Sequence, residues 1–582
     1  MDRLFKRSES AKFTALNKMW EFITDPDKKG VDEKWFKNFP EKSITMSVPS
    51  CWNTTLGYFR YVGTAWYRTQ FSTESDSVRI IFDAVSNECD VYIDGRHIGY
   101  HYGPFVEFSF DAEGIGKGTH ELVVRVDNTT NTTDTIPHTN TDWYNYGGIC
   151  RTVGILELDN CNIHSLTCKY DLSEDLKNVS LKIISDIATQ SPVTDDLEIE
   201  INGESVYKKT VTIDGKSEYV ADGIHLENIK LWDINKPNLY YIAVKFGGAD
   251  LTDRIGFRKI EARGKDLYLN NRKIKIIGVC RHEIHPDWGF AMPFELIKKD
   301  IDIIRDMNCT AVRGAHYPHN QKTIDYCDEL GLLFWEEIPL WGNLQSWAES
   351  LKTESFIDRI MTMFKEMMKR DMNHPSLIFW GLYNEIDTSL PQTRALTKRM
   401  AEYVKSQDLS RLTSYATCSI HLGNPADICS DLVDVVGFNY YIGWFPTSKQ
   451  ESFEEFIMRM RAQTDKNSGG REMPMMMSEF GGAGLKGACS FEQQRWTENY
   501  QSLLLTKGIE SYFGSNELCG GYIWQFSNTQ CQPHFETQRP GGVNNKGMVD
   551  EFRRPKLVFE TVKQLYCKLN PDSDNVTEIE LF

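Results

Sequence analysis

The chain has 582 residues, which suggests three to five domains at the usual size of about 100–200 residues each. Its apolar and charged fractions, 41% and 25%, are typical of a globular protein. The net charge of −17 disfavours binding to nucleic acid or to anionic lipid, because both need concentrated Lys and Arg. An anionic small molecule would need a local positive pocket.

The sequence contains no run of about twenty apolar residues that could span a membrane. Its first residues, MDRLFKRSESAKF, lack the apolar segment of a signal peptide. We therefore expect a cytoplasmic protein that does not contact membranes. Its fourteen cysteines are then expected to stay reduced.

Short strand-like runs separated by turn residues fill the first part of the chain. Residues 1–160 alternate in this way, with a hairpin signal at Asp94-Gly95, and predict a jelly-roll-like β-sandwich. Residues 161–263 continue in the same style, with a turn at Asn202-Gly203, and fit an immunoglobulin-like β-sandwich.

The pattern changes in residues 264–582, where apolar runs alternate with long amphipathic segments. One of these segments, FIDRIMTMFKEMMKRD, has helical spacing of its apolar residues and stops before Pro375. The eight runs are KIKIIGVCRHE, CTAVRGAHYP, GLLFWEEIP, LIFWGLYNE, LTSYATC, DVVGFNYY, MPMMMSEFG and CGGYIWQFSN. Eight apolar runs alternating with helical segments over about 300 residues predict a C-terminal (β/α)₈ TIM barrel.

Seven of the eight runs end in polar or aromatic side chains. These are Arg281, His282, Glu283, Arg313, His316, Glu336, Glu337, Asn384, Glu385, Asn439, Tyr441, Glu479, Trp524 and Gln525. Any one of them has a structural alternative as a salt bridge at the barrel rim, but together they indicate a site. Parallel barrels carry their chemistry at this end of the strands, and paired carboxylates such as Glu385 and Glu479 suit glycoside hydrolysis.

The stretches RDMNHPSLIFWGLYNE, SEFGG and GVCRHEIHPDWG resemble signatures of family 2 glycoside hydrolases, and the order of domains is similar too. The resemblance implies a retaining enzyme with Glu385 as general acid/base and Glu479 as nucleophile. It places Asn384 at the sugar 2-hydroxyl and Tyr441 beside the nucleophile. Asn439 and His316 are expected to line the same sugar site. A carbohydrate-binding protein on a degenerate barrel would need a lost carboxylate, and both are present.

The segment RPGGVNNKGMVDEFRRPK resembles a β-glucuronidase signature in which an Asn and a Lys hold the C6 carboxylate. By this resemblance Asn544 and Lys546 bind the carboxylate, with Arg539 and Trp524 in the same pocket. Asp142, within DWYNYGGI, matches a residue that reaches the sugar. The implied function is an exo-β-glucuronidase that acts on small glucuronide conjugates or on oligosaccharides ending in glucuronic acid.

Three features depart from that pattern. Phe445 stands where bacterial glucuronidases often have Tyr after Gly-Trp, so one sugar-directed hydroxyl is absent. No long insertion separates Trp341 from Asn373, which predicts an open site without a covering loop. The stretch HEIHPDWG, which contains His285, looks closer to β-galactosidases. A β-galactosidase or β-galacturonidase activity therefore remains the alternative.

Neither a cofactor nor a metal is predicted. Gly482, Gly484 and Gly487 spell G-x-G-x-x-G, but they follow a barrel strand and are interpreted as an active-site loop. The cluster of His282, Glu283, His285, His316 and His319 lacks the spacing of zinc hydrolases. Some similar gut bacterial glucuronidases carry an accessory flavin, which nothing in these residues predicts. The family resemblance also implies a homo-oligomer.

Overall fold

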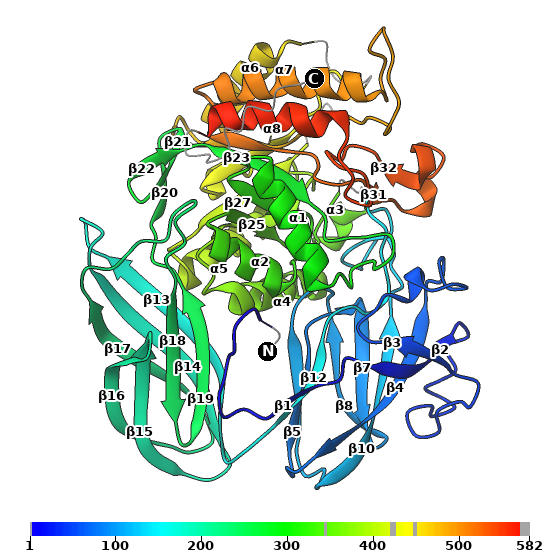
Figure 1. Ribbon diagram of the computed structural model, residues 1–582, viewed down its shortest axis with the longest axis vertical. Coiled ribbons are helices and arrows are strands. Elements are labelled where there is room, and N and C mark those ends of the chain that lie inside the picture. The colour runs from blue at the N-terminus through cyan, green and yellow to red at the C-terminus, as the bar shows by residue number, and fades with distance from the viewer. Residues whose placement is uncertain (1–2, 343–345, 419–426, 446–450, 571–582) are drawn as a thin grey trace, which may run out of the picture.

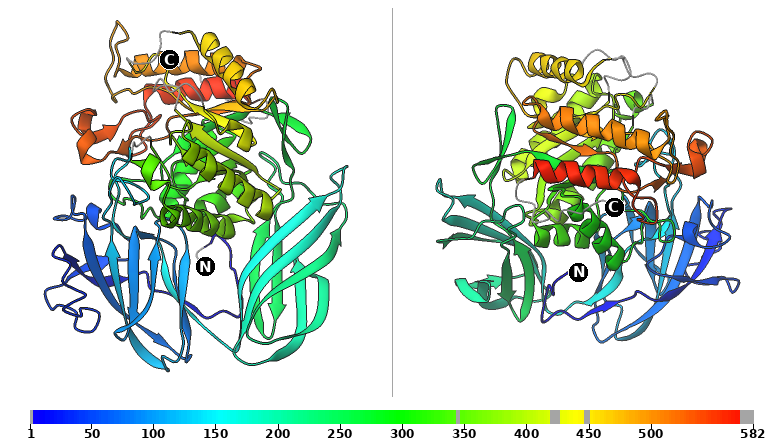
Figure 2. Two further views of the ribbon diagram at one scale, coloured as in Figure 1. Left: turned by 180° about the vertical axis from the view of Figure 1, so that it is seen from behind. Right: turned by 45° about the horizontal axis from the view of Figure 1, so that its top comes forward.

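The computed structural model describes residues 3–342, 346–418, 427–445 and 451–570. Two β-sandwiches lie side by side below a TIM barrel, and the N-terminal segment runs between them (Figure 1). The view from behind and the view with the top turned forward show the same arrangement (Figure 2). No helix in these described ranges is long and apolar enough to cross a membrane.

The first sandwich packs a six-stranded sheet, in the order β3-β2-β4-β10-β7-β8, against a four-stranded sheet, β1-β12-β5-β9. Side chains such as Phe22 and Tyr67 from one sheet and Ile80 and Ile155 from the other form its core. Asp94 and Gly95 both have positive φ and join β7 to β8, which confirms the predicted hairpin. The strands are β1 (Phe13–Ala15), β2 (Met19–Asp25), β3 (Ile44–Ser47), β4 (Thr64–Thr73), β5 (Val78–Phe82), β6 (Val85–Ser86), β7 (Glu88–Ile93), β8 (Arg96–Tyr102), β9 (Phe108–Ala112), β10 (Gly118–Asp127), β11 (Gly148–Ile149) and β12 (Val153–Glu157).

The second sandwich is immunoglobulin-like, with a three-stranded sheet, β13-β14-β17, on a four-stranded sheet, β16-β15-β18-β19. Ile183 and Ile199 are among the buried residues between them. The turn at Asn202-Gly203 joins β15 to β16 as predicted. The strands are β13 (Cys161–Leu172), β14 (Val179–Thr189), β15 (Val193–Ile201), β16 (Glu204–Ile213), β17 (Lys216–Leu226), β18 (Tyr240–Phe246) and β19 (Ala249–Ile255). A small antiparallel sheet follows, with strands β20 (Ile260–Arg263), β21 (Asp266–Leu269) and β22 (Arg272–Ile274).

All eight apolar runs predicted as barrel strands form the closed barrel, in chain order. The strands pair in parallel throughout. They are β23 (Ile276–Arg281), β24 (Ala311–Gly314), β25 (Leu333–Glu337), β26 (Leu377–Asn384), β27 (Leu412–Thr417), β28 (Val435–Asn439), β29 (Met475–Phe480) and β30 (Gly520–Ile523). A two-stranded ribbon, β31 (Thr529–Gln530) and β32 (Val543–Asn544), follows the last of them.

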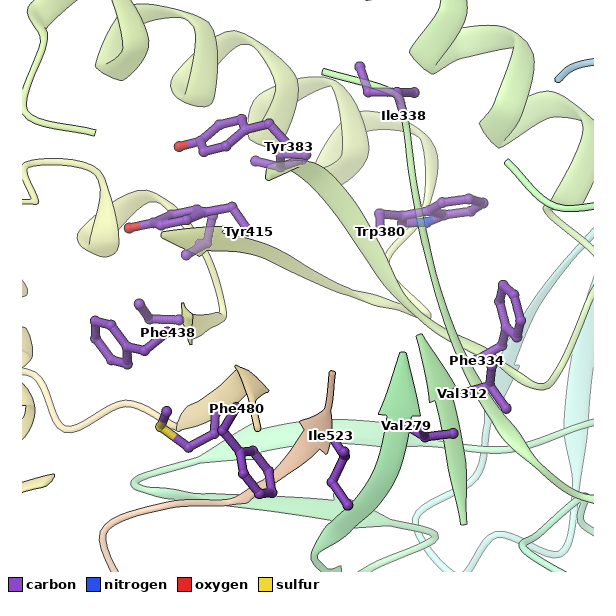
Figure 3. Packing of buried hydrophobic residues seen from close by; sticks show 14 of the residues in the cluster. Val279, Val312, Phe334, Ile338, Trp380, Tyr383, Tyr415, Phe438, Phe480 and Ile523 are labelled. Atoms are coloured by element: carbon purple, nitrogen blue, oxygen red, sulfur yellow. The ribbon is translucent and has the colours of Figure 1, made fainter. Parts of the chain in front are cut away.

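Helices cover the outside of the barrel. They are α1 (Phe294–Asp306), α2 (Gln321–Leu330), α3 (Trp347–Ser350), α4 (Glu354–Asp371), α5 (Pro391–Gln407), α6 (Phe453–Asn467), α7 (Glu498–Gly514) and α8 (Leu557–Leu569). Every barrel strand contributes at least one side chain to the apolar layer under these helices, including Val279, Tyr415 and Ile523 (Figure 3). A second cluster, with Trp335, Met476 and Tyr522, contains the side chains of the barrel interior. The barrel is thus a packed scaffold that fixes its strand ends.

Arg3 connects the N-terminal segment to two domains at once. Its guanidinium forms two hydrogen bonds with Asp325 of α2, at 2.8 and 2.7 Å, and lies 3.5 Å from Asp253 of β19. All three side chains are buried. Asp325, Asp328 and His374 are close enough together to suggest a cation site. The Arg3 guanidinium already supplies positive charge to this group.

We expect Arg3→Ala to lower the free energy of unfolding by about 2–3 kcal/mol, because it removes two charge-assisted hydrogen bonds to the buried Asp325. Asp325 and Asp253 then keep their longer contacts with Arg254 and Arg7, at 3.5 and 3.3 Å. Urea titration followed by fluorescence measures the change. Lys6→Ala is the matched control, since Lys6 and its partner Glu9 have side chains that are 63% and 80% exposed. Such a pair contributes about 0–1 kcal/mol. Equal midpoints for the two variants would contradict the role given to Arg3.

Candidate active site

Glu385 and Glu479 both lie at the C-terminal end of the barrel. Glu385 directly follows β26 with a left-handed backbone, φ 59°, and its N–H donates to the Ala416 carbonyl of β27 at 2.9 Å. Few non-glycine residues adopt this conformation, and those that do are frequent at functional sites. Glu479 is the fifth residue of β29 and is 4% exposed.

Glu479 is held by a cation and a phenol. Its Oε1 accepts a hydrogen bond from Arg313 Nη1 at 3.0 Å, and its Oε2 accepts one from the Tyr441 hydroxyl at 2.6 Å. Burial raises the pKa of Glu479 to about 7, although Arg313 and Tyr441 both favour the charged form. The carboxyl is therefore poised to be ionised near neutral pH.

Glu385 has a higher pKa than Glu479. Burial and then the negative charge of Glu479 raise the pKa of Glu385 to about 8, against a hydrogen bond from Asn439 Nδ2 at 2.9 Å. The two carboxyls are linked by hydrogen bonds: Asn439, which donates to Glu385, also donates to Asn384, and Asn384 accepts from the Arg313 that holds Glu479. Two coupled carboxyls with separated pKa values are the arrangement in which one donates a proton while the other stays charged.

Asn384 presents one free amide donor beside this pair. Its Oδ1 accepts hydrogen bonds from Arg313 Nη2 at 2.8 Å and from Asn439 Nδ2 at 3.1 Å. Its Nδ2 is buried and has no hydrogen-bond partner within the described part of the chain. A buried donor without a partner costs free energy unless a ligand satisfies it.

His316 and Trp524 form one wall of the site. Their rings stack with centroids 4.9 Å apart, and His316 Nδ1 lies 2.6 Å from Glu337 Oε1. Burial holds the pKa of His316 well below its usual value, so the ring is neutral at pH 7. Because Nδ1 pairs with Glu337, Nε2 is left as an acceptor, 3.7 Å from Glu479 Oε1.

Lys546 is a buried cation next to Tyr441, the residue that donates to Glu479. Its Nζ lies 5.6 Å from the ring centroid of Tyr441, whose hydroxyl binds Glu479, and within 6 Å of the rings of Trp444 and Phe445. Burial, together with the charge of Arg539, lowers the pKa of Lys546 to about 8. The ammonium is therefore held in a poorly hydrated place, where an added anion would stabilise it.

Asp142 reaches this pocket from the first sandwich. Its carboxylate lies 2.5 Å from Arg539 Nη2 and accepts a hydrogen bond from Asn544 Nδ2 at 2.9 Å. Asn544 Oδ1 in turn lies 3.4 Å from Lys546 Nζ. The structure thus brings together all eleven residues predicted for the site, through contacts that connect the carboxylate pair to the Lys546 pocket.

Other polar residues at the strand ends serve the barrel instead. Arg281 binds Asp300 of α1, and Glu336 binds Arg370 of α4. Trp380 and Tyr383 of β26 bond to Asp408 and Thr397 in the helical layer. These side chains face away from the carboxylate pair because neighbouring residues of a strand alternate between its two faces.

Two residues belong to the site without being predicted as binding or catalytic residues. Arg313 is predicted only as a polar strand end, yet its guanidinium contacts Glu337, Glu479 and Asn384 together. The hydroxyl of Ser478 donates to Asn439 Oδ1 at 2.7 Å. A polar residue inside the otherwise apolar run MMMSEF was the available signal for Ser478.

Comparison with known proteins places the whole architecture in one family. Models of glycosyl hydrolases family 2 match the TIM barrel domain at residues 260–570, the sugar binding domain at 13–159 and the segment between them at 161–258. The barrel match alone covers more than half of the chain. The protein therefore belongs to family 2 of the glycosyl hydrolases and is a glycoside hydrolase.

The similar proteins have three different sugar specificities. A solved structure of a family 2 β-galacturonidase from Eisenbergiella tayi, bound to galacturonate, has a TM-score of 0.89 at 29% identity, covering 98% of this chain and 99% of that one. The β-glucuronidase of Sus scrofa is 24% identical over 97% of this chain and 92% of its own length. The β-galactosidase of Thermoanaerobacterium thermosulfurigenes is 27% identical over 86% and 67%.

Proposed function

We propose that the protein is a retaining exo-β-uronidase that hydrolyses β-D-glucuronides. The observation that carries this proposal is Lys546, a buried ammonium against Tyr441 in a chain of net charge −17. A neutral sugar has no charged group that could offset the free-energy cost of burying the ammonium. The C6 carboxylate of a uronide would form a charge-assisted hydrogen bond with Lys546 and restore its favoured charged form.

The two carboxyls supply a double-displacement mechanism. Glu479 attacks the anomeric carbon while Glu385 gives its proton to the leaving oxygen, which forms a covalent glycosyl-enzyme. This step consumes the charge of Glu479, one of the causes that raise the pKa of Glu385. The pKa of Glu385 then falls, and its carboxylate takes a proton from the water that releases the sugar.

The neighbouring groups fit the hydroxyls of the same sugar. The free Nδ2 donor of Asn384 is suited to the 2-hydroxyl, as the family resemblance implies, and His316 Nε2 offers an acceptor. The Asp142 carboxylate, fixed by Arg539 and Asn544, is suited to accept from a ring hydroxyl farther from the anomeric carbon. The bond to Asn384 would satisfy a buried donor that has no partner among the described residues.

A β-galacturonidase activity is the second candidate. The similarity to the Eisenbergiella tayi β-galacturonidase favours it. Glucuronides and galacturonides differ only in the configuration at C4, while Lys546 is proposed to bind the group at C6. Lys546 is therefore expected to favour uronides over galactosides, but not to discriminate between glucuronides and galacturonides. The β-galactosidase alternative has no matching use for the buried ammonium.

We further propose that the entrance accepts bulky or extended aglycones. Between Trp341 and Asn373 the described residues form only the short α3 and the outer helix α4. Phe445, at the rim of the Lys546 pocket, is 40% exposed. An exposed ring at the mouth of the site can pack against an apolar aglycone or a second sugar.

The test is a panel of p-nitrophenyl β-glycosides that differ only at C4 and C6. We expect kcat/KM for the glucuronide to exceed that for the glucoside by about 10- to 100-fold, the value of a charge-assisted hydrogen bond. NMR of the first-formed anomer tests retention. A galactoside as the best substrate, or an α-configured first product, would contradict the proposal.

The pH dependence follows from three pKa values. Activity needs ionised Glu479, so it rises through a pKa of about 7. It also needs protonated Glu385 and, for a uronide, protonated Lys546, so it falls above about 8. We expect a narrow bell-shaped pH profile of kcat/KM, with its maximum between these two pKa values. Initial rates from pH 5 to 10 measure it, and a maximum near pH 5 would contradict the assignment.

A further inference from the structure

The orientation of the Asn439 amide decides which of its atoms meets Glu385. Nδ2 donates to Glu385 Oε1 at 2.9 Å and to Asn384 Oδ1 at 3.1 Å, which uses both of its hydrogens. Oδ1 points the other way and accepts the hydroxyl of Ser478 at 2.7 Å. The amide therefore bridges the strand of one glutamate to the strand of the other.

Ser478 reaches Asn439 because of an irregularity in the barrel. In the pairing of β28 with β29, Phe438 is opposite Met477 and Asn439 is opposite Glu479, so Ser478 is the extra residue of a bulge. Bulges re-aim side chains, and this one brings a hydroxyl and the adjacent Glu479 to the same site. The Ser478 side chain is fully buried.

The space around the Ser478 hydroxyl is tightly defined. A Cβ placed on Gly437 of β28 would lie 2.7 Å from Ser478 Oγ, so the glycine leaves room for it. The Ser478 carbonyl accepts a hydrogen bond from Arg313 Nη1 at 3.1 Å. Both ends of the residue are thus fixed, and the hydroxyl has little freedom to bond elsewhere.

We propose that Ser478 is a positioning residue for hydrolysis, whose hydroxyl holds the Asn439 amide so that its Nδ2 donates to Glu385. This inference rests on the acid/base role proposed for Glu385. Without the hydroxyl, Asn439 Oδ1 becomes a buried acceptor without its partner. The amide plane is then held from one side only, so the Nδ2 bond to Glu385 weakens, and its loss disfavours the carboxylate form of Glu385.

Several other groups act on the same carboxyl. The charges of Glu479 and Asp142 favour protonated Glu385, and Arg313 favours the ionised form. Cys418 and Tyr441 also interact with Glu385, but their pKa values are raised well above the ordinary range, so both stay neutral. The Asn439 donor is thus one of the few groups that favour the base form required in the second step.

The test is a double-mutant cycle of Ser478→Ala and Asn439→Ala. The pH profile is measured with a neutral aryl glycoside, because protonation of Lys546 also limits hydrolysis of a uronide above about pH 8. We expect Ser478→Ala to move the basic limb of kcat/KM to higher pH by about 0.5–1 unit. We also expect about tenfold lower kcat for a dinitrophenyl glycoside, whose good leaving group makes release of the sugar rate-limiting. In the Asn439→Ala background, Ser478→Ala should cause neither change.

Controls distinguish a loss of positioning from a loss of folded enzyme and from a wrong assignment of the substrate. Titration with a 2-fluoro glycoside counts active sites, so that rates refer to folded enzyme. Ser478→Cys, which is slightly larger and a weaker donor, should shift the limb in the same direction by less, and it replaces the alanine variant if that does not fold. An unmoved limb, or an equal shift without Asn439, would overturn the positioning role. A neutral glycoside as best substrate would overturn uronide specificity alone.

Discussion

Glu479→Ala is expected to lower kcat for an aryl β-glucuronide by about 10³-fold or more, because it removes the atom proposed to form the covalent intermediate. Its effect on the fold should be small, since Arg313 keeps its bonds to Glu337 and only the bonds of Glu479 to Arg313 and Tyr441 are lost. Steady-state kinetics and circular dichroism measure the two effects.

Azide distinguishes a lost nucleophile from a damaged site. In Glu479→Ala, azide can enter the vacated space and yield the α-glycosyl azide. In Glu385→Ala, a substrate with a good leaving group still forms the intermediate, and azide then yields the β-glycosyl azide. Glu472→Ala, an exposed residue just before β29, is the matched control and should behave as wild type. Near-normal turnover by Glu479→Ala would contradict the proposed mechanism.

Lys546→Met is expected to lower kcat/KM for a glucuronide by on the order of 10²–10³-fold, because the substrate carboxylate would be buried without its cation, at about 2–5 kcal/mol. Methionine keeps an apolar stem among Tyr441, Trp444 and Phe445. Hydrolysis of the matching glucoside should change by less than about threefold.

The surface residue Lys486 provides the comparison, since its side chain is 39% exposed and it bonds to the Pro555 carbonyl. Lys486→Met should leave both substrates unaffected. If Lys546→Met weakened hydrolysis of glucuronide and glucoside equally, the ammonium would have a structural role and uronide recognition would have to be assigned to other residues.

The fold could be predicted because its signals are local. Each barrel strand is a short apolar run, and the two hairpins have residues that accept positive φ, as at Asp94-Gly95 and Asn202-Gly203. The ends of the strands identified Glu385 and Glu479 from the same pattern. These features depend on neighbours in the sequence, so one chain is enough to read them.

The contacts within the site depend on details that the sequence does not display. Arg281 and Arg313 both lie near strand ends, yet Arg281 turns to α1 while Arg313 holds Glu479. The bulge at Ser478 shifts the alternation of faces by one residue. Asp142 comes from another domain, and only the resemblance to a known family pointed to it.

Asp142 makes the first β-sandwich part of the site that the barrel carries. Its carboxylate anchors both Arg539 and Asn544 from a separate β-sandwich. An excised barrel would keep its glutamates but lose the support for the residues around Lys546. The groups proposed to cleave the glycosidic bond and those proposed to select the sugar thus lie partly on different domains. Exchange of the loop that carries Asp142 could therefore change the sugar preference without changing Glu385 or Glu479.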